Sequence, residues 1–324
     1  MIVRLLEKEA LFFSTSSVLI PKSDPWREKV IHWFFSIVSA LGGNQPVGVE
    51  HPFDRVTVHV STALMDNYLA SLSSERNARF RNDKVAYQVL ATSCLMLGMR
   101  IVHRHQRNEL LRQQQEIGNE VPSSSGEMKR SSKLHQNMDQ HARSNFINIA
   151  DVFEIPNISS MLRISAASRS ISEAHVLAMV REIASSRVFS RSRPVTALDF
   201  IQVFSKKAND LALTFNASTL QLEPSQERNA SLLADAGLVC SRCQKPSVVA
   251  CAAMTVAMLR STPVENMTSV RQLVFRSIFG EHQNDESLQL VRDVEYHLLR
   301  ATSRNGNHMP HRTRISSHVI PQEE

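Results

Sequence analysis

The cysteines and histidines are the residues in this chain that could bind a metal ion or supply a nucleophile. Cys240 and Cys243 form a CxxC pair, but a zinc site needs further ligands at a suitable spacing, and neither a second CxxC nor an HxxxH follows. The histidines are scattered, with no Ser/His/Asp or Cys/His arrangement and no Gly-rich phosphate loop. We therefore expect no catalytic residue, no metal site, no cofactor and no enzyme activity, and we interpret the CxxC as a turn between helices.

The other two cysteines, Cys94 and Cys251, lie in long apolar stretches. Four cysteines in 324 residues do not suggest a disulfide framework, and a buried free cysteine behaves as a small apolar residue. The opening run, MIVRLLEKEALFF, has no basic region before a long apolar core and no small-residue cleavage site, so it does not match a secretory signal. We expect reduced core thiols and an intracellular protein, located in the nucleus, the cytoplasm or both.

The net charge of +6 would suit an acidic partner. The basic residues are scattered, however, and no dense Lys/Arg block is interleaved with aromatic residues, as in a nucleic-acid interface. A solvated surface explains the charge more simply, so nucleic acid is not an expected partner.

Residues 84–102 (KVAYQVLATSCLMLGMRIV) are apolar almost all the way round a helix, with a thin polar stripe at Lys84, Gln88 and Thr92. A surface helix would keep a whole polar face, so the pattern predicts a helix enclosed by other elements. The alternative is a membrane span, which needs about 20 apolar residues. This run is shorter, contains polar residues and ends in arginines that begin with Arg100. We predict a core helix and no membrane segment.

Helical patterns recur along the chain, whereas strand signals are sparse. Residues 246–259 (PSVVACAAMTVAML) repeat the apolar character of residues 84–102. The periodicity predicts further helices at residues 26–41, 55–72, 157–164, 172–185, 196–204, 228–239, 269–279 and 286–301. Five helices, one of them fully enclosed, thus appear twice, and the predicted fold class is all-α with a duplicated plan.

Composition divides the chain into segments. Residues 1–23 are expected to form an N-terminal leader ending in a loop, where Ser23 or Asp24 can cap the next helix. Residues 24–192 form the first repeat, interrupted at about 106–145 by a segment rich in Gln, Ser, Asn and His that cannot bury enough apolar surface to fold. Residues 193–303 form the second repeat, and residues 304–324 form a polar tail.

These helices resemble those of the cyclin family. Arg27, followed six residues later by Trp33, is similar to the opening of the first cyclin-box helix, Met-Arg-x-x-Leu-x-Asp-Trp. The runs LMDNYL (64–69) and YQVLA (87–91) resemble parts of the second and third helices, and TALDF (196–200) and PSVVACAA (246–253) resemble motifs of the second box. The likeness implies two consecutive five-helix cyclin-box repeats, each around a buried central helix.

A cyclin is a regulatory subunit that binds a cyclin-dependent protein kinase and pushes a regulatory helix of the kinase inward, which assembles the kinase's active site. The resemblance implies kinase contacts at Arg100 and Glu182. Arg100 stands where the family has a Lys. Its charge is spread over a planar guanidinium with several donors, whereas a lysine carries the charge on a compact ammonium group. The alignment puts Val180 where the family has a Glu, and Glu182 lies two residues further on, about 200° round the helix.

In many cyclins the first helix also docks kinase substrates through apolar residues beside its Trp. The matching residues are Trp26, Val30 and Trp33, with Lys29 in place of a further apolar residue. The resemblance therefore implies a partly preserved substrate-docking groove. A role in the core is the other interpretation of Trp33, because tryptophan is mostly buried on average.

The function that the resemblance implies is regulation of a cyclin-dependent kinase in cell-cycle progression. The alternative is a cyclin-fold adaptor of the transcription machinery, which would bind nucleic acid or protein without activating a kinase. The lack of a zinc ribbon and of a basic stripe in the sequence counts against the adaptor.

Overall fold

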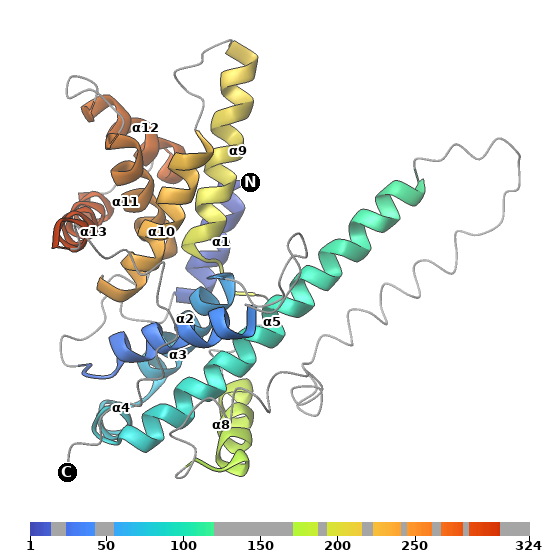
Figure 1. Cartoon of the computed structure of the whole chain (residues 1–324), viewed down its shortest axis with the longest axis vertical. Helices are drawn as coiled ribbons and strands as arrows, with labels where there is room; N and C mark the ends of the chain where they lie inside the picture. Colours follow the sequence, from blue (N-terminus) through green and yellow to red (C-terminus); the bar gives the residue numbers. More distant parts are fainter. Residues whose placement is uncertain are drawn as a thin grey trace, which may run out of the picture.

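The structure, a computed structural model, describes residues 1–13, 24–42, 55–119, 171–186, 193–215, 223–240, 245–260, 267–280 and 285–304. These residues form α-helices and no β-strand, which confirms the all-α class (Figure 1). The helices are α1 (Ile2–Phe13), α2 (Arg27–Gly42), α3 (Arg55–Ser71), α4 (Ser74–Asn82), α5 (Lys84–Asn119), α8 (Glu173–Ser185), α9 (Ala197–Phe215), α10 (Pro224–Cys240), α11 (Pro246–Leu259), α12 (Met267–Phe279) and α13 (Asp285–Arg304).

The helices pack into two hydrophobic cores, which we call the first core and the second core. The first core is built mainly from α2, α3, α5 and α8, and the second mainly from α9 to α13. The two sets of helices occupy different ends of the body in Figure 1. In the first core, α5 contacts α2, α3, α4 and α8; in the second, α11 contacts α9, α10, α12 and α13. Each core therefore surrounds one central helix.

Both central helices are enclosed, as their composition predicts. Every residue from Val89 to Met99 in α5 and from Pro246 to Ala257 in α11 is buried. Among the described helices, α5 is also long and apolar enough to cross a membrane over Lys84–Glu109, but 78% of its apolar window is buried inside the protein. Cys94 and Cys251 are free, buried thiols, as predicted, and burial raises the pKa of each.

Each central helix comes close to a neighbouring helix at a glycine. A Cβ atom on Gly98 of α5 would lie 2.1 Å from Oγ of Ser61 in α3. A Cβ atom on Gly237 of α10 would lie 2.8 Å from Cγ1 of Val249 in α11. Both distances are too short for packed atoms, so only glycine permits these contacts without rearrangement.

The N-terminal leader contains a helix that joins the two cores. α1 packs against α9 and α11. Ile2 at its start lies in the second core, whereas Phe12 and Phe13 at its end lie in the first. Residues 2–13 are thus part of the packed body and do not form a separate leader.

Glu9 provides the polar contact between α1 and the second core. Its side chain is buried, its Oε1 accepts the backbone N–H of Ser247 at 2.7 Å, and its Oε2 accepts the Ser247 hydroxyl at 2.7 Å. Ser247 lies in the first turn of α11, whose N-cap residue Lys245 makes no side-chain cap, so Glu9 satisfies this helix end from another helix. Burial raises the pKa of Glu9, although the bonds from Ser247 and the charge of Lys245 act in the opposite direction.

Other helices follow the predicted ranges closely, with three exceptions. α4 is not predicted; Ser73 caps it by accepting the N–H of Arg76 at 3.4 Å. α5 continues to Asn119 and so extends into the segment at about 106–145 where the composition predicts an insertion. α9 continues to Phe215, beyond the predicted end at residue 204. The rest of the predicted insertion, the predicted helix at 157–164 and residues 305–324 lie outside the described residues. Ser172 caps α8 as predicted, accepting the N–H of His175 at 3.3 Å.

We predict that Gly98→Ala destabilises the protein, although alanine normally favours a helix over glycine by about 0.5–1 kcal/mol. The new methyl group would force the Ser61 side chain out of its hydrogen bond to the carbonyl of Thr57. We expect a net loss of about 1–3 kcal/mol in the free energy of unfolding, measured by urea denaturation. Adding Ser61→Ala should recover part of the loss, and an unchanged stability of Gly98→Ala would contradict the close contact.

We also predict a pH-dependent contribution from Glu9. In the folded state the pKa of Glu9 is raised above its ordinary value of 4.5. The contribution of Glu9 to stability is therefore fully present below the unfolded-state pKa and is lost as the pH rises through the folded-state pKa. Glu9→Gln should remove this part of the pH dependence, whereas Glu9→Ala should cost about 1–3 kcal/mol by leaving buried donors unpaired. Urea unfolding of the three proteins between pH 4 and 8 measures both effects; identical pH profiles for wild type and Glu9→Gln would refute the prediction.

Candidate functional site

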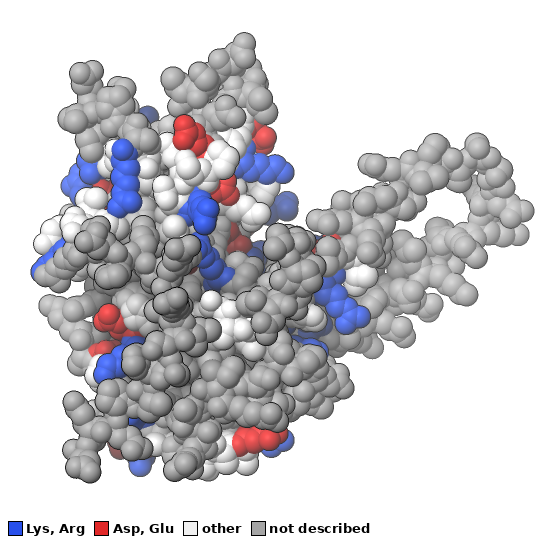
Figure 2. Space-filling model, viewed as in Figure 1, with Lys and Arg blue, Asp and Glu red and all other residues white. Residues whose placement is uncertain are grey.

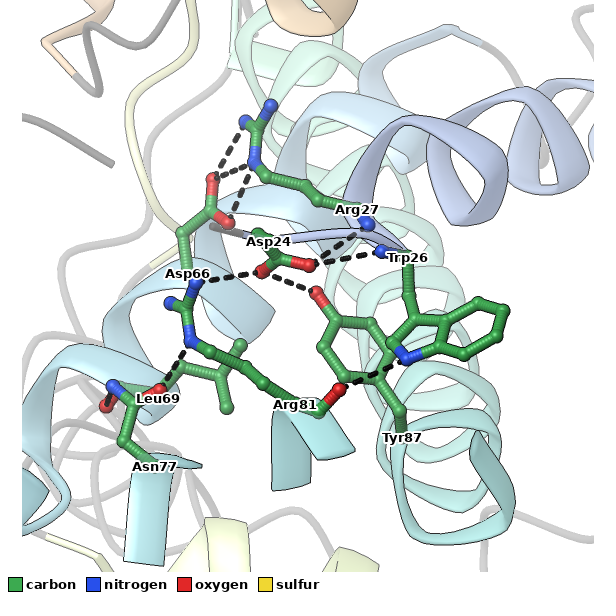
Figure 3. Close-up of polar contacts among 8 residues, drawn as sticks. All are labelled: Asp24, Trp26, Arg27, Asp66, Leu69, Asn77, Arg81 and Tyr87. Atoms are coloured by element: carbon green, nitrogen blue, oxygen red, sulfur yellow. Dashed lines mark hydrogen bonds and ion pairs between the residues drawn. The ribbon is translucent and has the colours of Figure 1, made fainter. Parts of the chain in front are cut away.

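A buried ion pair joins the first and second helices of the cyclin-like motifs (Figure 3). Arg27 Nε donates to both carboxylate oxygens of Asp66, at 2.9 and 3.2 Å, and Arg27 Nη2 donates to Asp66 Oδ2 at 2.8 Å. The side chains are only 8% and 7% exposed. Burial acts to lower the pKa of Arg27, but the Asp66 carboxylate outweighs it and the pKa is raised. The guanidinium therefore stays charged in the interior.

The same arginine links the first core to the second. Arg27 Nη1 donates to the carbonyl oxygen of Leu238, near the end of α10, at 2.7 Å. Asp235, one turn earlier in α10, lies 3.1 Å from His59 Nε2 and 3.2 Å from Arg55 Nε, both in α3. These contacts fix α10 against α2 and α3, so the two cores are held together by directed polar contacts as well as by packing.

Asp24 organises the start of α2. Its Oδ1 accepts the backbone N–H groups of Trp26 and Arg27 at 3.1 and 3.0 Å, so it caps the helix as the sequence predicts. Its Oδ2 accepts the Tyr87 hydroxyl at 2.9 Å and forms an ion pair with Arg81 at 3.2 Å. Burial and the charge of Asp24 raise the pKa of Tyr87. Figure 3 shows these side chains converging from α2, α4 and α5.

Arg100 lies where α5 passes from its enclosed part to its exposed part. The residue is half-buried, directly after the buried run that ends at Met99. Arg104 and Arg107 follow at i+4 and i+7, positions that share one face of a helix, and Leu111 continues that face with 49% exposure. The pKa of His103 is lowered by burial and then by Arg100 and Arg107, as expected for a shared basic face. We call Arg100, Arg104 and Arg107 the arginine stripe.

The three arginines are separated by other residues in the sequence, and only the continuation of α5 as a helix aligns them. Figure 1 shows this part of α5 projecting away from the packed helices. On the face shown in Figure 2, Lys and Arg side chains lie at the surface where α5 leaves the body. The stripe spans about 10 Å along the helix at 1.5 Å per residue.

Glu182, the second predicted kinase contact, lies on α8, which packs against α5. Its Oε1 accepts the Tyr68 hydroxyl at 2.6 Å and forms an ion pair with Arg76 of α4. Burial, and then the bond to Glu182, raise the pKa of Tyr68. Both bonds use the same carboxylate oxygen, and the side chain is 41% exposed. Glu182 thus ties α8 to α3 and α4, and it keeps an exposed face.

Val180 stands at the position where the cyclin resemblance expects a Glu. Its side chain is 0% exposed and belongs to the first core. This position therefore faces inward, and a carboxylate here would be desolvated without a partner. The substitution of Val for Glu agrees with the packing.

The predicted substrate-docking residues lie against the first core. Val30 is 8% exposed and is part of that core, whereas Trp26 and Trp33 are partly buried and pack against it. The ammonium groups of Lys29 and Lys84 lie 5.4 and 5.9 Å from the centre of the Trp26 ring, within the range of a cation–π contact. Of the three predicted docking residues, only the two tryptophans are partly exposed.

The described residues contain no group of three or more His, Cys, Asp or Glu side chains placed to hold a metal ion. The side chains of Cys240 and Cys243 lie outside the described residues, so the interpretation of the CxxC as a turn stays a prediction.

No protein-family model, curated protein or solved structure matches this chain. The cyclin resemblance therefore depends on the residues themselves. The ion pair of Arg27 with Asp66 joins two residues that come from different motifs of the sequence.

We predict that Asp66→Ala destabilises the protein by about 3–5 kcal/mol, because it leaves the Arg27 charge buried without its partner. The double variant Arg27→Met/Asp66→Leu should lose much less stability than the sum of the losses in Arg27→Met and Asp66→Leu, since apolar side chains of similar size need no partner. Urea denaturation of the wild type, these two single variants and the double variant measures the cycle.

A matched control is Arg76→Ala, which removes an ion pair whose side chains are 54% and 41% exposed. Its effect should stay within about 1 kcal/mol, as for other surface pairs. Equal losses for Asp66→Ala and Arg76→Ala would show that the buried pair has no special role.

Proposed function

We propose that this chain is a divergent cyclin, built from two consecutive five-helix cyclin-box repeats at residues 24–192 and 193–303. Three features support the proposal: two cores each surround one enclosed helix, each core has a glycine contact at its central helix, and a buried ion pair joins Arg27 to Asp66. The ion pair carries the proposal, because it connects two motif residues that are distant in the sequence.

The function that follows is regulation of a cyclin-dependent protein kinase in cell-cycle progression, in the nucleus, the cytoplasm or both. Such a subunit supplies no catalytic group and acts through a surface of fixed shape. We propose that Arg100 is the central kinase contact and that Arg104 and Arg107 extend it along α5. A guanidinium pairs well with carboxylates because its donors match both oxygens in one plane.

In this proposal Glu182 has two tasks. Its Oε1 holds α8 through Tyr68 and Arg76, and its partly exposed carboxylate offers an acceptor to the kinase. The contact would differ from that of other cyclins, because Val180 occupies their Glu position and is buried. Kinase binding would therefore depend more on the basic end of α5 than on α8.

The test is binding of the purified chain to a panel of purified cyclin-dependent kinases, followed by a phosphorylation assay on a general protein substrate. Arg100→Glu should weaken binding to the responsive kinase by about tenfold or more, since a charge in contact with its partner is reversed. Arg112→Glu is the matched control: it is an exposed arginine of the same helix, about 120° round the helix from Arg100.

Equal weakening by Arg100→Glu and Arg112→Glu would contradict a specific contact at Arg100. Failure of the wild-type chain to bind any kinase of the panel would reject kinase regulation itself.

The arginine stripe also bears on the alternative, a cyclin-fold adaptor of the transcription machinery. Binding of duplex DNA whose affinity falls steeply with salt, and falls further in Arg104→Glu/Arg107→Glu, would favour the adaptor. Kinase binding without salt-dependent binding of DNA would favour the regulatory subunit.

A further inference from the structure

A shallow, open hollow is lined by residues of α9 and α12, two helices of the second core. Its volume is about 340 Å³. The described residues that line it are Lys207, Ser269, Gln272, Leu273, Arg276 and Ser277. All except Lys207 come from one face of α12, at i, i+3, i+4, i+7 and i+8.

The lining carries two positive charges and no acidic residue among its described members. Lys207 and Arg276 reach the hollow from different helices, and neither has a carboxylate partner among the described residues. Six of the other described arginines have one, in the pairs Arg27–Asp66, Arg55–Asp235, Arg76–Glu182, Arg81–Asp24, Arg193–Asp199 and Arg271–Glu295. Arg271 is on α12 as well and pairs with Glu295 of α13. Arg276 of the same helix instead shares the hollow with Lys207.

The two positive charges beside the hollow repel each other, whereas an anion bound between them would attract both. The remaining polar groups also suit an anion. The hydroxyls of Ser269 and Ser277 and the amide of Gln272 can each donate a hydrogen bond. A phosphate monoester, with a charge near −2 and three acceptor oxygens, matches this set of donors better than a single carboxylate does.

Leu273 indicates what else the ligand contains. It lies between the polar residues on the same face of α12, and its side chain is 40% exposed. A free phosphate ion would gain nothing from this apolar surface, whereas a side chain next to a phosphorylated residue could cover it. None of the described lining residues is aromatic, so the hollow has no stacking surface for a nucleic-acid base.

We propose that this hollow binds the phosphate group of a phosphorylated serine or threonine in a protein segment, with Lys207 and Arg276 on the phosphate oxygens and Leu273 against a neighbouring apolar side chain. The site goes beyond the proposed kinase regulation and does not depend on it.

The test measures fluorescence anisotropy with a labelled peptide library that has phosphoserine fixed at its centre and all other positions degenerate. The wild-type chain should bind it at least about tenfold more tightly than the same library with serine, since the charge-assisted hydrogen bonds are lost with the phosphate. Arg276→Gln and Lys207→Gln should each weaken binding of the phosphorylated library by about tenfold. Leu273→Ala should weaken it by a smaller factor.

Arg300→Gln is the matched control, because Arg300 is an exposed arginine of the second half on α13 and does not line the hollow. It should leave binding unchanged. Arg276 and Lys207 are exposed, so the urea midpoints of their variants should equal that of the wild type, and a shifted midpoint together with lost binding would point to unfolding and reject the local contact.

Three outcomes would overturn the proposal. Equal binding of the two libraries would exclude phosphate recognition. Full competition by inorganic phosphate at the concentration of the peptide would assign the hollow to a free anion. Tighter binding of a labelled oligothymidylate than of the phosphorylated library, lost in Arg276→Gln, would assign it to nucleic acid.

Discussion

The ion pair of Arg27 with Asp66 is the interaction on which the arrangement of the two cores depends. A guanidinium that is withdrawn from water is stable only when its donors are satisfied. Here Nε and Nη2 are satisfied by Asp66 of α3, and Nη1 is satisfied by the carbonyl of Leu238 in α10. One side chain therefore fixes α2, α3 and α10 relative to one another. Since α10 packs on the central helix of the second core, the charge of Arg27 sets how the two cores meet.

Glu9 of α1 makes a second connection to the second core. α1 contributes apolar residues to both cores, and its buried carboxylate caps α11 through Ser247. The contacts of Asp235 with His59 and Arg55 add a third link. A protein held in this way has little freedom to move one core against the other. Such rigidity would suit the regulatory role that we propose, in which the chain holds its partner in a fixed geometry.

The sequence was informative where the signal is local. The enclosed helices, the buried cysteines, and the caps at Asp24 and Ser172 depend on residue types at short spacing, and the structure agrees with them. α4 was missed because it is short and polar, with its only start signal at Ser73 and Glu75. The pairing of Arg27 with Asp66 and the cap that Glu9 provides join residues from different helices, and the hollow is lined by Lys207 of α9 and Arg276 of α12. No periodicity encodes such contacts, since they depend on how the helices pack.

The position of Arg100 shows how packing in the core controls a surface residue. Gly98 lets α5 approach Ser61 of α3 so closely that the helix axis is fixed at this point. Arg100 follows two residues later in the same helix, so the position of its backbone is fixed by the same contact. Ile101 and Val102 still belong to the first core, and the helix becomes largely exposed only from His105 on. The packing that positions the stripe therefore weakens from Arg100 towards Arg107. A partner that pairs with the stripe therefore gains most from Arg100, because the entropy of ordering this residue has already been lost in folding.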